Sequence, residues 1–249
     1  MPVFAKILIV TLALPVGQEL LRRSGRWPAW CLFLALPAAL ASHWIAINDF
    51  DWFQWVKVYT VFFCVVWGTA LRFTTLGERP WAKATIPLLL GANILEAVAR
   101  DAFAGGFAHL LNAAAGLVLV AAVPYGSTRT WIDSRGDLLS ATSRTWILGY
   151  TTWNWTFVYL NYPALAGHHV AVLAASLFIG LYAPHRWTQV RAHTLGLHLF
   201  GSANWYPDVN DWLNTTAWTD ETGGLIAAGI AFAIAAAIAL TPASRTRPG

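Results

Sequence analysis

The sequence predicts an all-α protein, a polytopic membrane bundle of about nine transmembrane helices, or eight if the first segment does not cross. Nine apolar stretches follow one another along the 249 residues, and the short polar segments between them carry charge that alternates in sign. Only 11% of the residues are charged and the mean hydropathy is +0.51, whereas roughly a quarter of a water-soluble domain is charged. Lipid is therefore the expected surrounding.

Each stretch has about the length that a bilayer requires. Hydrocarbon offers no partner to backbone N–H and C=O groups, so a spanning segment must be a helix of roughly 20 residues. In chain order we expect helices at 3–16, 28–47, 54–73, 81–99, 103–123, 143–160, 163–182, 187–206 and 223–240. The first is short and the eighth is the most polar. No long linker interrupts them, so we expect one domain over residues 1–249, with at most a short surface helix in the polar segment 125–144.

The amino-terminal segment does not have the order of charge and hydrophobicity that marks a cleaved signal peptide. Lys6 lies inside its apolar run, so we expect the segment to be retained as a helix. Cys31 and Cys64 both fall in apolar stretches, where a thiol behaves as a small hydrophobe, and no disulfide framework is implied.

The distribution of basic residues predicts the orientation, with the N-terminus outside and the C-terminus cytoplasmic. If all nine helices cross, 13 of the 16 Lys and Arg lie in or beside cytoplasmic segments, and the positive-inside bias favours that arrangement. They are Arg22, Arg23, Arg26, Arg72, Arg79, Lys83, Arg129, Arg135, Arg144, Arg186, Arg191, Arg245 and Arg247, against Lys6, Lys57 and Arg100 outside. We expect a location in the cell (cytoplasmic or inner) membrane. The net charge of +4 is then a topology signal, with no nucleic-acid partner.

Acidic residues follow the opposite pattern and gather at the expected outer side. They are Asp49, Asp51, Glu96, Asp101, Asp208, Asp211, Asp220 and Glu221. Most of the 15 tryptophans fall at helix ends, where the amphipathic ring prefers the headgroup layer. They are Trp27, Trp44, Trp52, Trp55, Trp81, Trp131, Trp146, Trp187, Trp205, Trp212 and Trp218. Trp153 and Trp155 lie instead within a span, on either side of Asn154, where they could form an aromatic wall for a ligand or simply pack against other helices.

Glu96 is the sharpest candidate for a functional residue. An ionisable side chain within a span needs a partner, a hydrated cavity or a function. Asn93, Glu96 and Arg100 fall at i, i+3 and i+7, which places all three on one helical face, and Asp101 follows directly. A plain alternative is that Glu96 and Arg100 form an ion pair that neutralises two charges.

Two adjacent histidines, His168 and His169, begin the seventh stretch. Imidazole titrates near neutral pH, which suits acid/base chemistry, although a histidine in a span also serves as a hydrogen-bonded packing residue. Asn154 and Tyr159 lie on the preceding stretch, so the sixth and seventh helices form an antiparallel hairpin. His109, His198 and Asn204 add polar groups at the same side. This one-sided distribution predicts a polar cavity that opens to the extracytoplasmic leaflet.

We find no sequence signature of a metal site or of a bound cofactor. There is no HExxH pair, clustered cysteine set, Walker sequence, dinucleotide fingerprint or Gly-x-Ser-x-Gly elbow. The expected partners are membrane lipids and an amphiphilic or small-molecule substrate. No cofactor or metal is predicted, and the sequence predicts no oligomeric state.

These features favour an enzyme that carries out hydrolysis or group transfer on a lipid or other amphiphile. Glu96, His168 and His169 are the candidate catalytic residues: Glu96 as general base and a histidine as its acid/base partner. Arg100 is the candidate anchor for a phosphate or carboxylate. The remaining substrate-binding candidates are Asn93, Asp101, Trp153, Asn154, Tyr159 and Asn204. A proton-coupled small-molecule transporter and a noncatalytic assembly or ligand-binding subunit are the alternatives.

Overall fold

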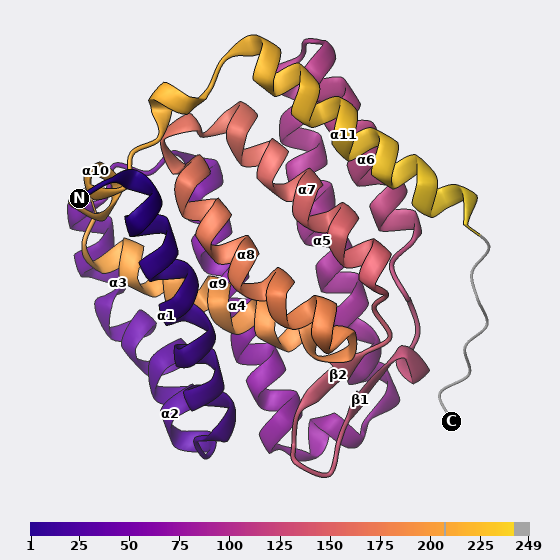
Figure 1. Cartoon of the computed structure of the whole chain (residues 1–249). Coiled ribbons are helices and arrows are strands. Elements are labelled where there is room, and N and C mark those ends of the chain that lie inside the picture. The colour runs from indigo at the N-terminus through magenta and orange to yellow at the C-terminus, as the bar shows by residue number, and fades with distance from the viewer. Residues whose placement is uncertain (207, 242–249) are drawn as a thin grey trace.

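The structure is a computed structural model that describes residues 1–206 and 208–241 (Figure 1). Every one of the nine predicted stretches is helical. The helices are α1 (Val3–Arg23), α2 (Arg26–Trp30) leading through a π-helical stretch (Cys31–Ala35) into α3 (Leu36–Ile47), α4 (Trp52–Phe73), α5 (Pro80–Ala104), α6 (Phe107–Ala121), α7 (Arg144–Asn161), α8 (Ala166–Tyr182), α9 (Trp187–Asn204), the short α10 (Asp208–Trp212) and α11 (Glu221–Leu240).

Six of these helical segments are long and apolar enough to cross a membrane. They comprise α1, the continuous α2–α3 segment, α4, α5, α8 with the turn before it, and α11. The helical class and the compatibility with a membrane therefore agree with the sequence analysis. Arg245 and Arg247, which contributed to the predicted orientation, lie outside the described residues.

Local chemistry explains where several helices begin and bend. Asp51 and Gln54 form a capping box at the start of α4, each side chain bonding the other residue's backbone N–H. Pro37 has no N–H to donate to the preceding turn. The π-helical stretch Cys31–Ala35 ends two residues before it, and its wider turn accommodates the missing hydrogen bond. Gly105 and Gly106 have φ of 72° and 84° and end α5, so the next helix starts at Phe107, four residues later than predicted.

The polar segment after α6 differs from its prediction. It forms a β-hairpin in place of a surface helix, with β1 (Thr130–Ile132) antiparallel to β2 (Leu138–Ser140) and Trp131 opposite Leu139. The turn is closed by the Asp133 carboxylate, which accepts from the backbone N–H groups of Arg135 and Asp137. Local side-chain bonding of this kind competes with helix formation, which explains why the segment is not helical.

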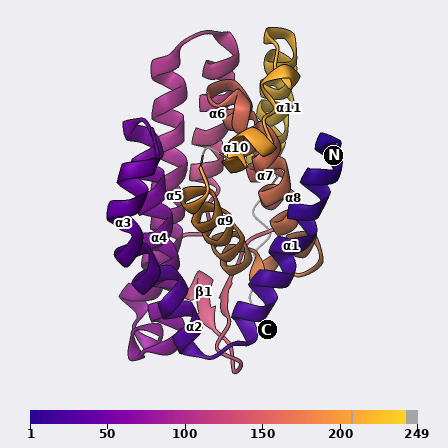
Figure 2. The ribbon, with the colours of Figure 1, turned by 90° about the vertical axis from the view of Figure 1, so that its left-hand side faces the viewer.

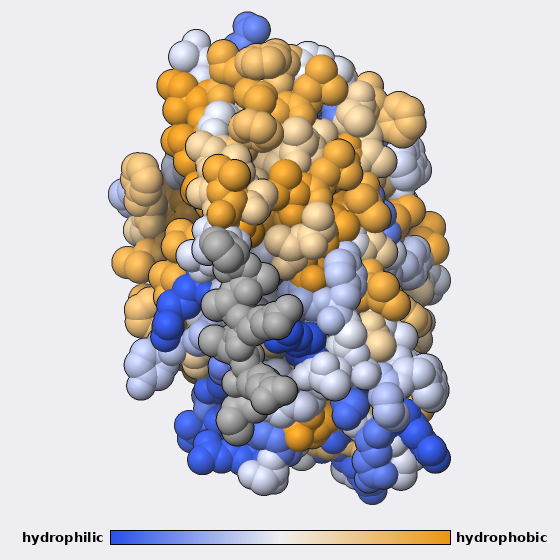
Figure 3. Space-filling view, turned by 90° about the vertical axis from the view of Figure 1, so that its right-hand side faces the viewer, coloured by the Kyte–Doolittle hydropathy of each residue, from blue (hydrophilic) through white to orange (hydrophobic). Residues whose placement is uncertain are grey.

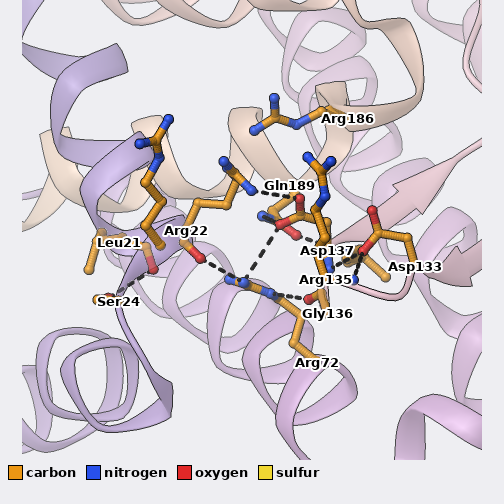
Figure 4. A network of polar contacts seen from close by, with 12 residues as sticks. Leu21, Arg22, Ser24, Arg72, Asp133, Arg135, Gly136, Asp137, Arg186 and Gln189 are labelled. Atoms are coloured by element: carbon orange, nitrogen blue, oxygen red, sulfur yellow. Dashed lines mark hydrogen bonds and ion pairs between the residues drawn. The ribbon is translucent and has the colours of Figure 1, made fainter.

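Asp137 fastens this hairpin to three helices (Figure 4). Its carboxylate accepts from Arg22 Nη1 of α1 at 3.0 Å and from Gln189 Nε2 of α9 at 3.1 Å, and it lies 3.7 Å from Arg72 Nη2 of α4. Arg72 also donates to the backbone oxygens of Gly136 and Arg22. Glu19 continues the network by pairing with Arg22 and Arg186. Strongly coupled charges therefore close this end of the bundle.

The helices form two packed groups (Figures 1 and 2). In one group α5, α6, α7 and α11 pack against one another around buried Trp153 and Leu119. In the other, α1 and α4 pack against α9, and α2–α3 lines the outside of α4 around buried Phe33 and Trp44. Helix α8 joins the groups because it packs against α7 on one side and α1 and α9 on the other.

The two ends of the bundle differ in charge. We call the end with the hairpin the basic end; it holds Arg22, Arg72, Arg135 and Arg186. The opposite, acidic end holds the turns at 48–51, 105–106 and 162–165 and the segment 213–220. On the face shown in Figure 3, apolar side chains cover the upper part and hydrophilic residues gather below, toward the basic end.

The tryptophans divide into two classes. Trp27, Trp52, Trp81 and Trp205 are exposed near helix ends, as an interfacial belt requires. For Trp44, Trp146 and Trp187 the predicted position in that belt is wrong, since each is a fully buried core residue. The Trp146 indole donates to the backbone oxygen of Leu119, which satisfies its polar atom inside the core.

We predict that Asp137→Ala destabilises the protein by about 3–5 kcal/mol, because it leaves the buried Arg72 and the half-buried Arg22 without their shared carboxylate. Thermal unfolding in uncharged detergent measures the effect, and limited proteolysis should cut the hairpin first. Glu78→Ala, which removes an exposed carboxylate, is the matched control. Equal unfolding temperatures for the two variants would contradict the role given to Asp137.

Candidate functional site

A deep cleft lies where the two helix groups meet. The space in and around it, with open solvent at the mouth included, is about 1070 Å³. Five helices line it: α4, α5, α7, α8 and α9. Along α9 the lining residues run from Arg191 to Ser202, a length of roughly 17 Å at about 1.5 Å per residue, and Tyr206 follows beyond the helix. The cleft is thus elongated along α9, and we call its end beside Phe50 and Tyr206, at the acidic end of the bundle, the mouth.

Three histidines occupy one wall. His168 and His169 come from the first turn of α8, and His198 comes from α9. The rings of His168 and His198 lie 5.3 Å apart between centroids, and His198 Nε2 is 3.3 Å from Ser202 Oγ. His168 is buried, and its Nε2 has no hydrogen-bond partner among the described residues. Both predicted histidines therefore face the same cleft, although they are adjacent in sequence.

Arg191 lies at the deep end of the cleft. It is 6% exposed, and Nη2 donates a long hydrogen bond of 3.4 Å to Asn154 Oδ1. Its Nε and Nη1 are buried without a hydrogen-bond partner in the described part of the chain. The guanidinium carbon lies 5.9 Å from the centre of the Tyr150 ring. Predicted residue Asn154 is thus in the cleft, beside a cation that the sequence analysis assigned only to topology.

Glu96 pairs with Lys57, and the alternative pairing with Arg100 is wrong. Lys57 Nζ lies 2.6 Å from Glu96 Oε2 and donates to Asn93 Oδ1 at 2.7 Å. Arg100 points the other way, with Nη2 3.8 Å from the Asp51 carboxylate. Helical spacing placed Glu96 and Arg100 on one face correctly, but the closer partner of each comes from α4 or the turn before it. Asn93 and Lys57 line the cleft.

Aromatic side chains frame the mouth. Phe53 stacks on Tyr162 at 6.1 Å between ring centroids, and Phe50 meets Tyr206 edge to face at 5.0 Å. Burial first, and the Asp51 charge second, raise the pKa of Tyr162 to about 12. This phenol therefore stays protonated at neutral pH and can donate a hydrogen bond at the mouth. Apolar residues such as Phe157, Leu165 and Leu195 line the walls between mouth and floor.

Asp101 lies outside the cleft, in a buried polar cluster. Its carboxylate is fully buried and accepts from Asn112 Nδ2 of α6 and Asn161 Nδ2 of α7, both at 2.7 Å, while His109 Nδ1 lies at 2.8 Å. Trp153 belongs to the same region: its buried indole donates to the backbone oxygen of Asn112. These contacts tie α5, α6 and α7 together, and neither residue lines the cleft.

Tyr159 and Asn204 also have structural partners away from the cleft. The Tyr159 hydroxyl accepts from the Asp220 backbone N–H and donates to the Trp218 backbone oxygen, which holds the segment leading into α11. Asn204 Oδ1 accepts from the Trp44 indole and so joins α9 to α3. Of the ten predicted site residues, the cleft lining includes four: Asn93, Asn154, His168 and His169.

Sequence analysis missed Lys57, Arg191 and Ser202 as site residues and treated His198 only as a further polar group. A signal was present on α9, because Arg191, Leu195, His198 and Ser202 follow the i, i+4, i+7, i+11 pattern of one helical face. The pattern was overlooked because Arg191 was used only as evidence for the membrane orientation. Among residues 1–206 and 208–241, no group of three His, Cys, Asp or Glu side chains is arranged to hold a metal ion.

A second cavity of about 770 Å³ adjoins the first and continues toward the basic end. Both share Val61, Asn93, Tyr150, Arg191 and Leu195. The second is lined further by Arg72, Gln189 and His193. Arg72 and Gln189 are held by Asp137, so the hairpin network closes its far side.

Comparison with known proteins gives one result. The model of a family of unknown function, DUF5692, matches residues 2–247. The chain belongs to the DUF5692 family. No curated protein and no solved structure matches the chain. The DUF5692 match covers the cleft, both helix groups and the hairpin, so these features lie within one family unit.

We predict that Asp101→Ala lowers the free energy of unfolding by about 3 kcal/mol or more, because three buried or half-buried donors lose their acceptor. Thermal unfolding in uncharged detergent measures it. Asp49→Ala, at an exposed carboxylate of the same end, should stay within about 0.5 kcal/mol. A folded, fully stable Asp101→Ala protein would show that the cluster is not structural.

Proposed function

We propose that the protein is a polytopic enzyme of the cell membrane that carries out hydrolysis or group transfer on an amphiphile held in the cleft. All nine long helices cross, the basic end faces the cytoplasm, and the cleft opens to the extracytoplasmic leaflet. The arginines gathered at the hairpin end support this orientation. The observation that carries the enzymatic proposal is the wall of three histidines beside Ser202 in a cleft with mostly apolar walls.

Two imidazoles in one cleft can supply both halves of acid/base catalysis. One accepts a proton from the attacking hydroxyl, either water or Ser202, and the other donates a proton to the leaving group. The unpartnered Nε2 of His168 and the contact between His198 and Ser202 support these roles. His169 is a third imidazole within reach of the same space.

The structure supports a changed role for Glu96. The Lys57 ammonium forms an ion pair with its carboxylate at 2.6 Å and also donates a hydrogen bond to Asn93 Oδ1. We therefore assign acid/base chemistry to the histidines and assign Glu96 to charge balance of Lys57. Lys57 and Asn93 then present a polar strip on the wall of α4 and α5, where they orient substrate.

A proton-coupled transporter is the second candidate, and a specific observation favours it. The two cavities share Arg191, and polar residues continue beyond it to Arg72 and Gln189. This weakens the sequence-based argument that polarity is confined to one leaflet. The ion pairs of Asp137 would then be a gate at the cytoplasmic side.

The proposed orientation predicts which residues are accessible from outside the cell. In a cysteine-free background, with Cys31 and Cys64 replaced by Ser, Ala217→Cys at the acidic end should react with a membrane-impermeant maleimide in intact cells. Thr128→Cys, an exposed residue before the hairpin, should react only after permeabilisation. The reverse pattern would invert the topology, and labelling of both would contradict it.

Activity is tested in proteoliposomes of phosphatidylglycerol and phosphatidylethanolamine, with lipid products followed by mass spectrometry. We expect His168→Gln and His198→Gln to reduce turnover by about 10²-fold or more, since acid/base groups contribute roughly 10²–10⁴-fold. His43→Gln, an exposed histidine on α3, is the control.

Equal turnover by wild type and the two cleft variants would contradict catalysis by the histidines. Passage of an entrapped pH signal with no change in the lipid would favour the carrier. No effect of any variant, with folding intact, would leave a noncatalytic ligand-binding subunit as the better description.

A further inference from the structure

Arg191 differs from Arg72, the other buried cation of the described residues, and from several half-buried ones. Arg22 and Arg72 share Asp137, Lys57 pairs with Glu96, and Arg186 pairs with Glu19. Arg191 is as deeply buried as Arg72, yet no carboxylate of the described residues lies within 4.0 Å of its nitrogens. Within the described chain, its one hydrogen-bond acceptor is the neutral amide of Asn154.

A buried charge without a partner is costly, so proteins pair such groups or use them for binding. The unpartnered nitrogens Nε and Nη1 belong to a residue of the cleft lining. A second, independent group points to the same need: His168, 3% exposed, has an unpartnered Nε2 in that cleft. The Arg191 nitrogens lack an acceptor, which is what an oxyanion provides, and His168 Nε2 donates to the same oxyanion when it carries the ring proton.

We propose that Arg191 binds the oxyanion, carboxylate or phosphate, of a single-chain amphiphile whose apolar part lies along the cleft. This names the substrate class of the proposed function and rests on the same cleft. The guanidinium is the recognition group at the floor, and Asn154 orients it. Phe53, Phe157 and Leu195 pack along the chain of the ligand.

The lining favours an amphiphile over a bare inorganic anion. Apolar residues follow the cleft from floor to mouth, and phosphate has no apolar part that would cover them. The lining residues of α9, from Arg191 to Ser202, extend over roughly 17 Å at about 1.5 Å per residue, a length that suits an extended alkyl chain. The cation at the floor favours a terminal negative charge over a neutral or positive headgroup.

Binding is measured on the full chain in dodecyl maltoside, an uncharged detergent, by native mass spectrometry and by the shift in unfolding temperature. The probes are dodecyl phosphate, dodecanoate, dodecanol, dodecyltrimethylammonium and inorganic phosphate. We expect the two amphiphilic anions to bind and stabilise the wild type. Dodecanol, the cationic amphiphile and inorganic phosphate should bind at least tenfold more weakly.

Arg191→Gln should weaken dodecyl phosphate binding at least tenfold, while Arg191→Lys retains part of it. Arg144→Gln, an exposed arginine at the basic end, is the matched control and should bind like wild type. Without ligand, Arg191→Gln should unfold at the same or a higher temperature than wild type, because an uncompensated buried charge has been removed. An arginine with a purely structural role would give the opposite shift.

Wild-type affinity in Arg191→Gln, or equal affinity for dodecanol and dodecanoate, would overturn the proposal. Equal affinity for inorganic and dodecyl phosphate would overturn its amphiphile part. If Arg191→Gln does not fold, Leu195→Trp decides, since a filled cleft must lose dodecyl phosphate and unchanged binding overturns the proposal. Binding without lipid turnover would support this site while the enzymatic function fails.

Discussion

The structure depends on one constraint: polar groups inside an apolar bundle must find their partners within it. Asp101 meets this constraint with three donors from α6 and α7, and Asp137 meets it with donors from α1, α4 and α9. Each of these carboxylates joins elements far apart in the sequence. An unsatisfied buried group is expensive, so these clusters fix how the helices are placed as well as neutralising charge.

The same constraint explains why a cleft lies between the two helix groups. Each group has its own apolar core, around Trp153 in one and Phe33 with Trp44 in the other. Between them, ion pairs and aromatic contacts hold the walls apart at both ends. Asp51, near Arg100 and Tyr162, braces the acidic end, and Asp137 braces the basic end. Space remains where neither core extends.

Much of the fold follows from the sequence because it depends on local composition. In the described part of the chain each predicted apolar stretch is helical, and the α7–α8 hairpin follows from Asn161, Tyr162 and Pro163, which leave room for only a tight turn. The β-hairpin was missed because it depends on the Asp133 carboxylate accepting from the backbone N–H groups of Arg135 and Asp137, which composition does not reveal. Hydropathy alone marks six of the helical segments as able to span a membrane, because α6, α7 and α9 are shorter or more polar.

The candidate site was less predictable, because a helical face is local but its partner is not. Spacing placed Asn93, Glu96 and Arg100 on one face correctly. Only the packing of α4 against α5 shows that Lys57 pairs with Glu96, while Arg100 lies near Asp51. Trp153 and Tyr159 have polar groups that could bind a ligand, but these groups donate to backbone oxygens outside the cleft. Periodicity can propose such residues; it cannot tell which already have partners.

Arg191 shows what that distinction means for function. A charge near a helix end reads as a topology signal, and on α9 it does lie toward the basic end. Packing then turns its side chain into the cleft, 3.4 Å from Asn154 and away from the carboxylates that serve Arg22 and Arg72. Arg72, the other buried cation of the described residues, lies 3.7 Å from the Asp137 carboxylate, whereas Arg191 has no such partner there, and this contrast is why we infer a bound anion. The polar group that the fold leaves unsatisfied is therefore more informative about binding than the many that it satisfies.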